Sequence, residues 1–325
     1  MKICKTQCGL AREPLRSPFG FKGGYINELW HPAVKLIDDD GATGVGCGVQ
    51  SVLWSDAEVF QRYYSSGGNS MMLTITARAL EMAKNIEWKT PVELLDALLP
   101  ELYDYAQKVC ALDHLRLTFV LNALVPVDNA AWMLYARRNK ITSFDALVPS
   151  EYRAALSERH QFLASVPLIT YALDDTAIRT LAAQGYPMFK IKLGADPAGN
   201  GDRQAMLEWD KQRLSQIHAI LSQVRTPYTV SGKAAYYLDA NGRYDSRDRL
   251  MNLLDHAEKI GALDQILVLE EPFPEENHLN VADLPVSVAA DESAHSDHDT
   301  LIRIGDGYKA VAIKAIAKTM SMSLK

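Results

Sequence analysis

The chain has 325 residues, of which 48% are hydrophobic and 23% charged, as in an ordinary globular protein. Its net charge of −6, with no basic patch interleaved with aromatic residues, argues against nucleic-acid binding. No apolar run is expected to reach the length that spans a membrane, and the N-terminus lacks a secretory apolar core. Four cysteines make no disulfide framework, so we predict a reduced, cytoplasmic protein.

Residues 1–140 predict an α+β domain. Residues 32–37 (PAVKLI) have the pattern of a strand, and the alternation over 45–49, after a turn signal, predicts an antiparallel partner. Apolar residues recurring at three- and four-residue spacing then predict helices over 70–86, 91–110 and 115–138. Pro100 and Pro126 are expected to kink or split the last two helices.

Residues 141–325 predict a second domain in which apolar strands alternate with amphipathic helices. Such alternation is typical of a parallel sheet in an α/β fold, and we predict a TIM-type (β/α) barrel. Six strands are visible, in PLITYAL, PMFKIKLG, KAAYYLD, DQILVLEEP, LPVSVAAD and YKAVAIKAIAK. A closed barrel needs eight, so we expect a modified barrel whose C-terminal strands are absent from this sequence.

Five of these strands end in charged residues. They are Lys190 and Lys192, then Asp239, Glu270, Asp291 and Lys314. The C-terminal ends of parallel strands meet at one mouth of a barrel, so these side chains are expected to converge. Each acid alone could equally be a helix N-cap or a turn residue. Three carboxylates in succession, facing lysines, instead predict a hard cation such as Mg²⁺ with bases beside it.

The two lysines of the first of these motifs are two positions apart. On a strand, Lys190 and Lys192 therefore point to the same face, whereas Phe189, Ile191 and Leu193 point to the other. A solvated pair on an edge strand is the alternative. If both lysines are buried, clustering and burial are expected to lower the pKa of the ammonium groups toward neutrality, which suits a general base.

Taken together, the motifs resemble the enolase superfamily, in the branch of muconate-lactonizing and mandelate racemase-like proteins that includes dipeptide epimerases and o-succinylbenzoate synthases. The matching segments are KIK (190–192), DANGRY (239–244), LEEPF (269–273), ADES (290–293) and IKAIAK (313–318). The resemblance implies that residues 1–140 form a capping domain and residues 141–325 the barrel. Family members usually carry Gly-Gly after the last lysine motif, where this chain has Met320 and Ser321.

The resemblance also implies roles for particular residues. The Mg²⁺ ligands, with Mn²⁺ as a possible substitute, would be Asp239, Glu270 and Asp291. The acid/base residues would be Lys192 and Lys314 on opposite faces of the substrate, with Lys190 tuning the pKa of Lys192. Substrate contacts would come from Phe19, Phe21, Trp54, Asn241 and Lys318.

The implied reaction is removal of the proton next to a carboxylate in a small-molecule substrate. Two lysines on opposite faces favour a racemase or epimerase that acts on an amino-acid derivative or dipeptide. Cycloisomerase, o-succinylbenzoate synthase and acid-sugar dehydratase activities remain open, as does a catalytically silent binding or structural homologue. A homo-oligomer is expected, with no nucleic-acid or membrane partner.

Overall fold

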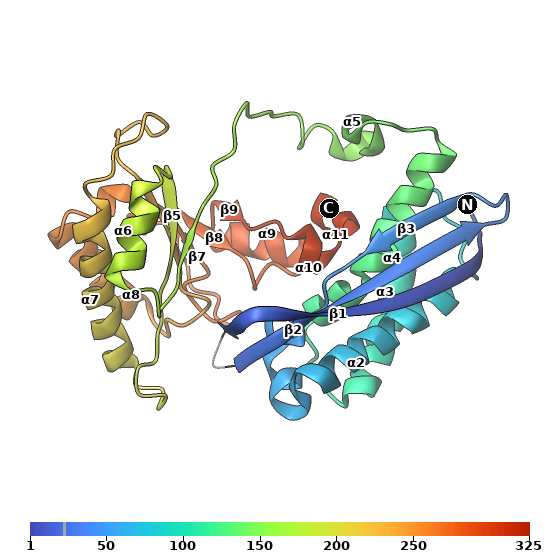
Figure 1. The fold of residues 1–325 in the computed structure, drawn as a ribbon, viewed down its shortest axis with the longest axis horizontal. Helices are drawn as coiled ribbons and strands as arrows, with labels where there is room; N and C mark the ends of the chain where they lie inside the picture. Colours follow the sequence, from blue (N-terminus) through green and yellow to red (C-terminus); the bar gives the residue numbers. More distant parts are fainter. Residues whose placement is uncertain (22–23) are drawn as a thin grey trace. The chain divides into compact units, whose positions relative to one another are not determined.

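The computed structural model describes residues 1–21 and 24–325 (Figure 1). The chain divides into two compact units, which are described separately. Unit 1 comprises Met1–Arg159 together with Ile313–Lys325, and unit 2 comprises His160–Ala312. The division thus falls after Arg159 rather than after the expected residue 140. The C-terminal segment also groups with unit 1, because its hydrogen bonds reach a helix of that unit, as described below.

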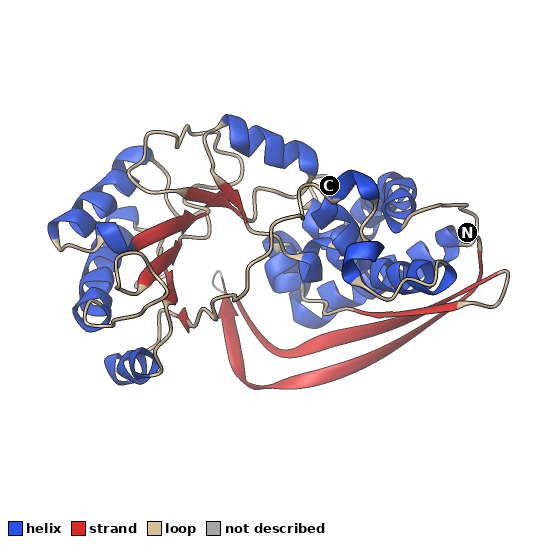
Figure 2. Ribbon diagram, turned by 90° about the horizontal axis from the view of Figure 1, so that it is seen from above, coloured by secondary structure: helices blue, strands red, loops and turns tan. Residues whose placement is uncertain are grey.

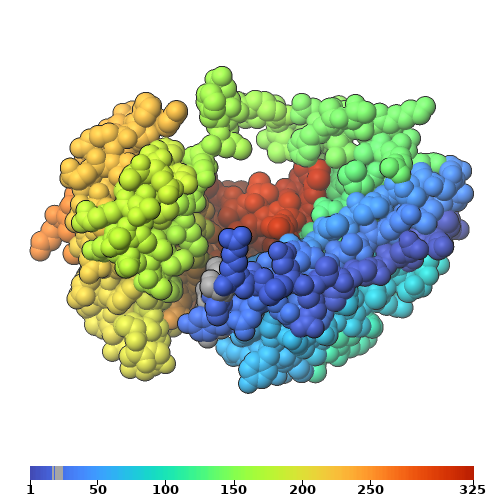
Figure 3. Space-filling model, in the orientation of Figure 1, coloured from blue at the N-terminus to red at the C-terminus, as the bar shows by residue number. Residues whose placement is uncertain are grey.

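Among the described residues of unit 1, three strands form an antiparallel sheet in the order β1-β2-β3. They are β1 (Ile3–Phe21), β2 (Gly24–Asp38) and β3 (Thr43–Cys47). The strand expected over 32–37 is confirmed as part of β2. Of the strand expected over 45–49, residues 45–47 lie in β3, which ends at Cys47. Strand β1 was not predicted from the sequence. Its residues are mostly exposed, and it lies on the molecular surface in dark blue (Figure 3).

Helices cover one face of this sheet (Figure 2). The helices that follow the sheet in the chain are α1 (Val52–Ser55), α2 (Ala57–Ala83), α3 (Pro91–Cys110), α4 (Leu117–Arg138), α5 (Phe144–Leu147) and the 3₁₀ turn η1 (Ser150–Tyr152). Of these, α1, α2 and α4 pack against the strands. The predicted helices over 91–110 and 115–138 are confirmed as α3 and α4. The expectation that Pro100 and Pro126 split them is wrong, since each proline lies inside one continuous helix.

Helix α4 is the central helix of unit 1. By length and composition it is the one helix, among the described residues, that could span a membrane, which corrects the expectation from the sequence. Its most apolar stretch is 83% buried inside the protein, however, as in the core helix of a globular domain. Its side chains pack with those of α2 and α3, including Met72, Ile75, Leu98 and Leu102.

Strand β3 approaches α4 so closely that it has glycine at the contact positions. A Cβ atom on Gly44 or Gly46 would overlap backbone atoms of Ala130. Replacing Gly46 with valine is therefore expected to lower the free energy of unfolding by about 3 kcal/mol, because neither backbone can move away cheaply. Gly9→Val on β1 is the matched control, since nothing lies within 4 Å of a Cβ there. Equal urea midpoints for the two variants would contradict this packing.

The C-terminal segment is anchored to α4 by buried hydrogen bonds. It contains the short helices α10 (Ala315–Lys318) and α11 (Met320–Leu324). The amide of Asn122 donates to the carbonyl of Ile316 at 3.2 Å. The carboxylate of Asp128 accepts from the N–H groups of Met320 at 3.0 Å and Ser321 at 3.1 Å, and also from the Ser321 hydroxyl. Ser321 is thus fully buried and Met320 half-buried, and both are held by Asp128 of α4.

Burial of Asp128 makes the stability of unit 1 depend on pH. Burial raises the pKa of this carboxyl group to about 6, against the opposing effect of its hydrogen bonds. Between about pH 4 and that value the native state holds a proton that the unfolded chain has lost, so stability falls as pH rises, by at most roughly 3 kcal/mol. We expect Asp128→Asn to remove this part of the pH dependence, measured as urea midpoints from pH 4 to 7. Parallel profiles for the wild type and the variant would contradict the assignment.

Unit 2, all of whose residues 160–312 are described, contains a six-stranded parallel sheet in chain order. Its strands are β4 (Leu168–Ile169), β5 (Met188–Lys192), β6 (Ala235–Asp239), β7 (Ile266–Glu270), β8 (Val288–Ala290) and β9 (Ala310–Val311). The intervening helices are α6 (Asp175–Ala183), α7 (Arg203–Leu221), α8 (Arg247–Lys259), η2 (Leu263–Gln265) and α9 (Asp297–Gly305). The predicted α/β fold, with its six parallel strands and an α+β domain before them, is confirmed.

The two faces of this sheet differ in character. Phe189 and Ile191 of β5 are fully buried in an apolar core shared with α6, α7 and α8, which lie along one side of the strands (Figure 2). Lys190 and Lys192 alternate with them and so lie on the other face. The two predicted faces of this strand are confirmed.

One strand end differs from the prediction. Strand β9 ends at Val311, so Lys314 does not end a strand. Instead Lys314 is the N-cap of α10, and its carbonyl accepts the N–H groups of Ala317 and Lys318, each at 2.8 Å. The segment AIAK has good helix formers, and the bond from Asn122 to Ile316 holds it in this turn.

Candidate active site

The register of unit 2 places charged residues in one row across neighbouring strands. Lys192 of β5 pairs with Asp239 of β6, and Asp239 pairs with Glu270 of β7. Asp291 directly follows β8. The three acids that the sequence singled out therefore come from adjacent strand ends, and all three are at most 2% exposed.

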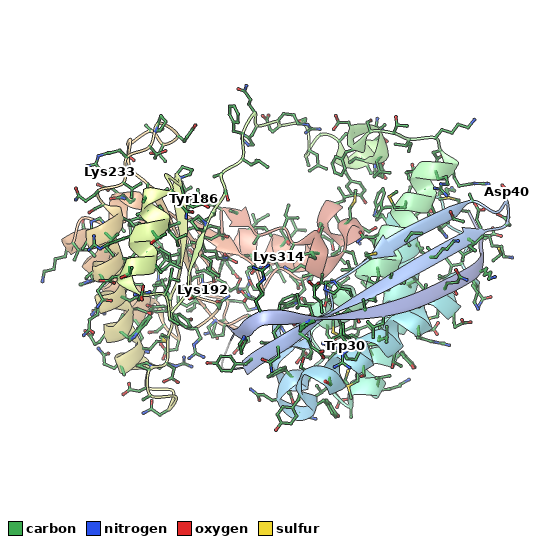
Figure 4. All side chains as sticks on the ribbon, viewed as in Figure 1. Trp30, Asp40, Tyr186, Lys192, Lys233 and Lys314 are labelled. Atoms are coloured by element: carbon green, nitrogen blue, oxygen red, sulfur yellow. The ribbon has the colours of Figure 1, made fainter. Side chains whose placement is uncertain are left out.

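Both lysines of β5 bond to these acids. Lys190 Nζ lies 2.8 Å from Asp239 Oδ2 and also pairs with Glu270 Oε2. Lys192 Nζ lies 2.6 Å from Asp239 Oδ2. Figure 4 labels Lys192 among the side chains of this unit. The Lys190 ammonium also lies 4.7 Å from the centre of the Tyr237 ring, which favours a cation at this position.

The crowding of carboxylates alters how they bind protons. Burial, repulsion from Asp239 and a hydrogen bond with Asp291 together raise the pKa of Glu270 to about 7, although Lys190 opposes this. Buried carboxylates that repel one another attract a cation, and in the structure the Lys190 ammonium is that cation. Three hard oxygen donors on adjacent strands also fit Mg²⁺ by their chemistry.

Lys190 departs from one expectation. Burial lowers the pKa of its ammonium group, as expected, but Asp239 and Glu270 outweigh burial and raise the pKa above the ordinary lysine value. The predicted depression of this pKa is wrong, because clustering with lysines matters less here than direct contact with two carboxylates.

The described residues contain no group of three His, Cys, Asp or Glu side chains already arranged around a metal position. Asp239, Glu270 and Lys190 are arranged instead as ion pairs. Binding of a divalent cation by these acids would therefore require the Lys190 ammonium to move away from at least one of them.

Asn241 lies in the turn after β6, where its side chain binds two charged residues. Its backbone has a positive φ of 45°, a conformation that asparagine tolerates, just before Gly242 in the turn after β6. Its side-chain oxygen accepts from Lys192 Nζ, and its amide donates to Glu292 Oε1 at 2.8 Å. Asn241 therefore orients Lys192, and its predicted contact with substrate stays a prediction.

Glu271 is a residue whose part in the site the sequence did not reveal. It is 1% exposed, and its Oε2 accepts the N–H of Asp291 at 2.7 Å and the hydroxyl of Ser293 at 3.0 Å. Burial, and then repulsion from Glu292, raise its pKa to about 7. The second acid of the Glu-Glu pair thus holds the turn that carries Asp291. The doubled acid after an apolar strand was the available signal.

The remaining predicted residues belong to unit 1. Trp54, Lys314 and Lys318 belong to unit 1, where Lys318 is 6% exposed and Lys314 is exposed. The side chains of Phe19 and Phe21 lie outside the described part of the structure. The roles predicted for these five residues stay predictions.

Comparison with known proteins bears on the strand–helix region. Residues 172–314 match the family model described as Enolase C-terminal domain-like, and this segment holds every member of the charged row. Residues 172–314 belong to the enolase superfamily. The sequence matches no curated protein at a significant level.

Solved structures of this superfamily share the fold along nearly the whole chain. An enolase-superfamily member from Listeria innocua has a TM-score of 0.64 at 19% identity, over 100% of this chain and 74% of its own. A dipeptide epimerase from Enterococcus faecalis, complexed with Mg and the dipeptide L-Leu-L-Tyr, has a TM-score of 0.60 at 15% identity, over 100% and 87%. An enolase family member from Agrobacterium tumefaciens with homology to dipeptide epimerases has 0.56 at 22%, over 97% and 76%. At these identities the likeness shows the fold.

Proposed function

We propose that the protein is a Mg²⁺-dependent enzyme that removes the α-proton of a carboxylate substrate, and that it racemises or epimerises a dipeptide or amino-acid derivative. The observation that carries the proposal is the row of Lys192, Asp239 and Glu270, with Asp291 on the next strand. Membership of residues 172–314 in the enolase superfamily supports it, as do structural neighbours described as dipeptide epimerases.

In this proposal Asp239, Glu270 and Asp291 hold the cation, for which Mn²⁺ could substitute. When bound, Mg²⁺ would supply positive charge that stabilises the negative charge of the deprotonated substrate. Lys190, freed from its present ion pairs, would remain as a fixed positive charge beside the substrate carboxylate.

The proton transfer is assigned to lysine side chains. Lys192 Nζ, oriented by Asn241, would take the α-proton from one face of one stereoisomer, and Lys314 would deliver a proton to the opposite face to give the other stereoisomer. In the reverse direction Lys314 would take the proton and Lys192 would deliver one. Binding of the Asp239 carboxylate to the cation would release Lys192 Nζ from its ion pair with this acid, so that the amine could reach the substrate.

Deuterium uptake tests the proposal. The protein is incubated in D₂O with dipeptides, N-acyl amino acids and sugar acids, with Mg²⁺ or with EDTA, and each compound is analysed by mass spectrometry. We expect one compound class to gain deuterium at the α-carbon with Mg²⁺ and not with EDTA. Uptake of equal size in EDTA would contradict the cation requirement.

The alternatives within the superfamily make different products from the same first step. Loss of water would indicate a dehydratase or o-succinylbenzoate synthase, and ring opening or closure a cycloisomerase. A catalytically silent homologue would give no exchange, and the ion pairs of Lys190 with Asp239 and Glu270 would then be its permanent state.

A further inference from the structure

We infer that Asp210 and Tyr244 form a buried positioning pair that fixes the strand end carrying Lys192, and so sets the efficiency of Lys192 in proton transfer. This inference rests on the proposed function. Asp210 lies on α7, Tyr244 follows β6, and both are 0% exposed. The Tyr244 hydroxyl donates to Asp210 Oδ2 at 2.7 Å.

The carboxylate of Asp210 also holds the backbone just after Lys192. The N–H of Gly194, two residues after Lys192, lies 2.9 Å from each Asp210 oxygen. Gly194 has a positive φ of 80°, and a Cβ there would overlap the side chain of Arg243. Glycine is thus required both for the turn and for the close approach.

Leu193 and Gly194, the two residues that directly follow β5, are also bound by other groups. Arg243 Nε donates to the carbonyl of Gly194 at 3.1 Å. The N–H of Leu193 donates to the carbonyl of Asp239 at 2.8 Å, and the Tyr171 hydroxyl donates to the carbonyl of Leu193 at 2.7 Å. The ends of β5 and β6, which carry Lys192 and Asp239, are thus held together by direct bonds and, in addition, through Asp210, which binds both Gly194 and Tyr244.

Burial of the Asp210 carboxylate costs free energy, because the charged group loses its contact with water. Its neighbours on α7, Leu207 and Leu214, are part of the apolar core. Burial raises the pKa of Asp210 to about 7, although Tyr244, the N–H of Gly194 and Arg243 all favour its charged form. An apolar residue at this place in the core would avoid that penalty, but it could not bind Gly194 and Tyr244 at once.

The pair of Asp210 and Tyr244 is expected to affect proton transfer by Lys192 but not by Lys314. Asp210 binds the N–H of Gly194, two residues after Lys192, and Tyr244 binds Asp210. Lys314 belongs to unit 1. If the pair positions Lys192, weakening it should slow the proton transfer on one face of the substrate selectively. A residue that only stabilises the fold would slow both transfers alike.

The test uses Tyr244→Phe, which keeps the buried ring and removes the bond to Asp210. Tyr236→Phe is the matched control, because Tyr236 is also 0% exposed and its hydroxyl binds His218 Nδ1 at 2.9 Å, with no bond to the β5 end among the described residues. α-Deuterium exchange is measured separately for the two stereoisomers of the best compound. Lys192→Ala and Lys314→Ala identify which stereoisomer each lysine serves.

We expect Tyr244→Phe to slow exchange of the stereoisomer served by Lys192 by about tenfold to a hundredfold, with KM and the other stereoisomer nearly unchanged. Tyr236→Phe should slow neither. Equal slowing of both stereoisomers by Tyr244→Phe, or no slowing of either, would overturn the inference while leaving the proposed function intact.

If the wild-type protein exchanges no compound, the proposed function fails and the exchange test cannot be used. A second measurement, which needs no activity, then tests the inference by itself. Lysines are methylated reductively with ¹³C-formaldehyde, and the resonance of Lys192 is assigned with Lys192→Ala. Positioning by the pair predicts that Tyr244→Phe shifts this resonance, and that Tyr236→Phe does not. Identical Lys192 resonances in wild type and Tyr244→Phe would overturn the inference.

Discussion

Lys192→Ala is expected to slow α-proton exchange by about 10²- to 10⁴-fold, the usual contribution of a positioned acid or base. The Nζ of Lys192 is bonded to Asp239 and Asn241, at the end of a rigid strand. Alanine leaves these two acceptors in place and removes the group that would carry the proton. The rate is measured by mass spectrometry in D₂O with saturating Mg²⁺.

Lys233→Ala is the control for this variant, because Lys233 is an exposed lysine of the same unit, before β6. It should exchange at the wild-type rate, and Figure 4 labels both lysines. Exchange by Lys192→Ala at the wild-type rate would contradict the assignment of this residue as a base.

Asp239→Asn is expected to abolish stabilisation by Mg²⁺. A cation that binds only the folded protein raises the free energy of unfolding by about 2.7 kcal/mol at a hundred times its Kd. Asp239 is the acid that contacts both lysines and pairs with Glu270 in the register, so it is central to the cluster. An amide has the same shape but no charge, and it should lose most of the cation affinity.

The measurement is the melting temperature with and without millimolar Mg²⁺. Asp255→Asn, a change at an exposed acid on α8, controls for nonspecific screening and should keep the full shift. If Asp239→Asn shifted as much as the wild type, the cation would bind elsewhere. If the wild type showed no shift, the three acids would not hold Mg²⁺ under these conditions.

The strand ends of unit 2 were predictable because a parallel sheet imposes its own geometry. Asp239 and Glu270 each end an apolar strand, and neighbouring parallel strands bring such residues into one row. Sequence alone could not predict that Lys190 would pair with two of these acids, since pairing depends on the register of three strands. The error about its pKa has the same origin.

The strands and helices of unit 1 were harder to predict from the sequence. Strand β1 contains Pro14 and Pro18 and has no clean apolar alternation, and its register with β2 breaks between Pro14 and Phe19. Backbone pairing with β2, rather than burial of side chains, accounts for the strand. Helix α2 begins at Ala57 rather than at residue 70, because Asp56 caps its first turn and the helix continues past a kink at Tyr64.

The C-terminal segment shows how long-range contacts override local pattern. Apolar residues up to Lys314 resemble a strand, yet the described strand stops at Val311. Asn122 and Asp128, nearly 200 positions earlier in the chain, bind Ile316 and Ser321 and hold this segment as short helices of unit 1. No local signal could have indicated these partners.

The most direct test of the account is a crystal structure of the protein grown with Mn²⁺, with anomalous data collected to locate the ion. The account predicts an anomalous peak in contact with the carboxylates of Asp239, Glu270 and Asp291, with the Lys190 ammonium moved away from Asp239 or Glu270. Lys190 still paired with both acids, and no peak among the three carboxylates, would contradict it.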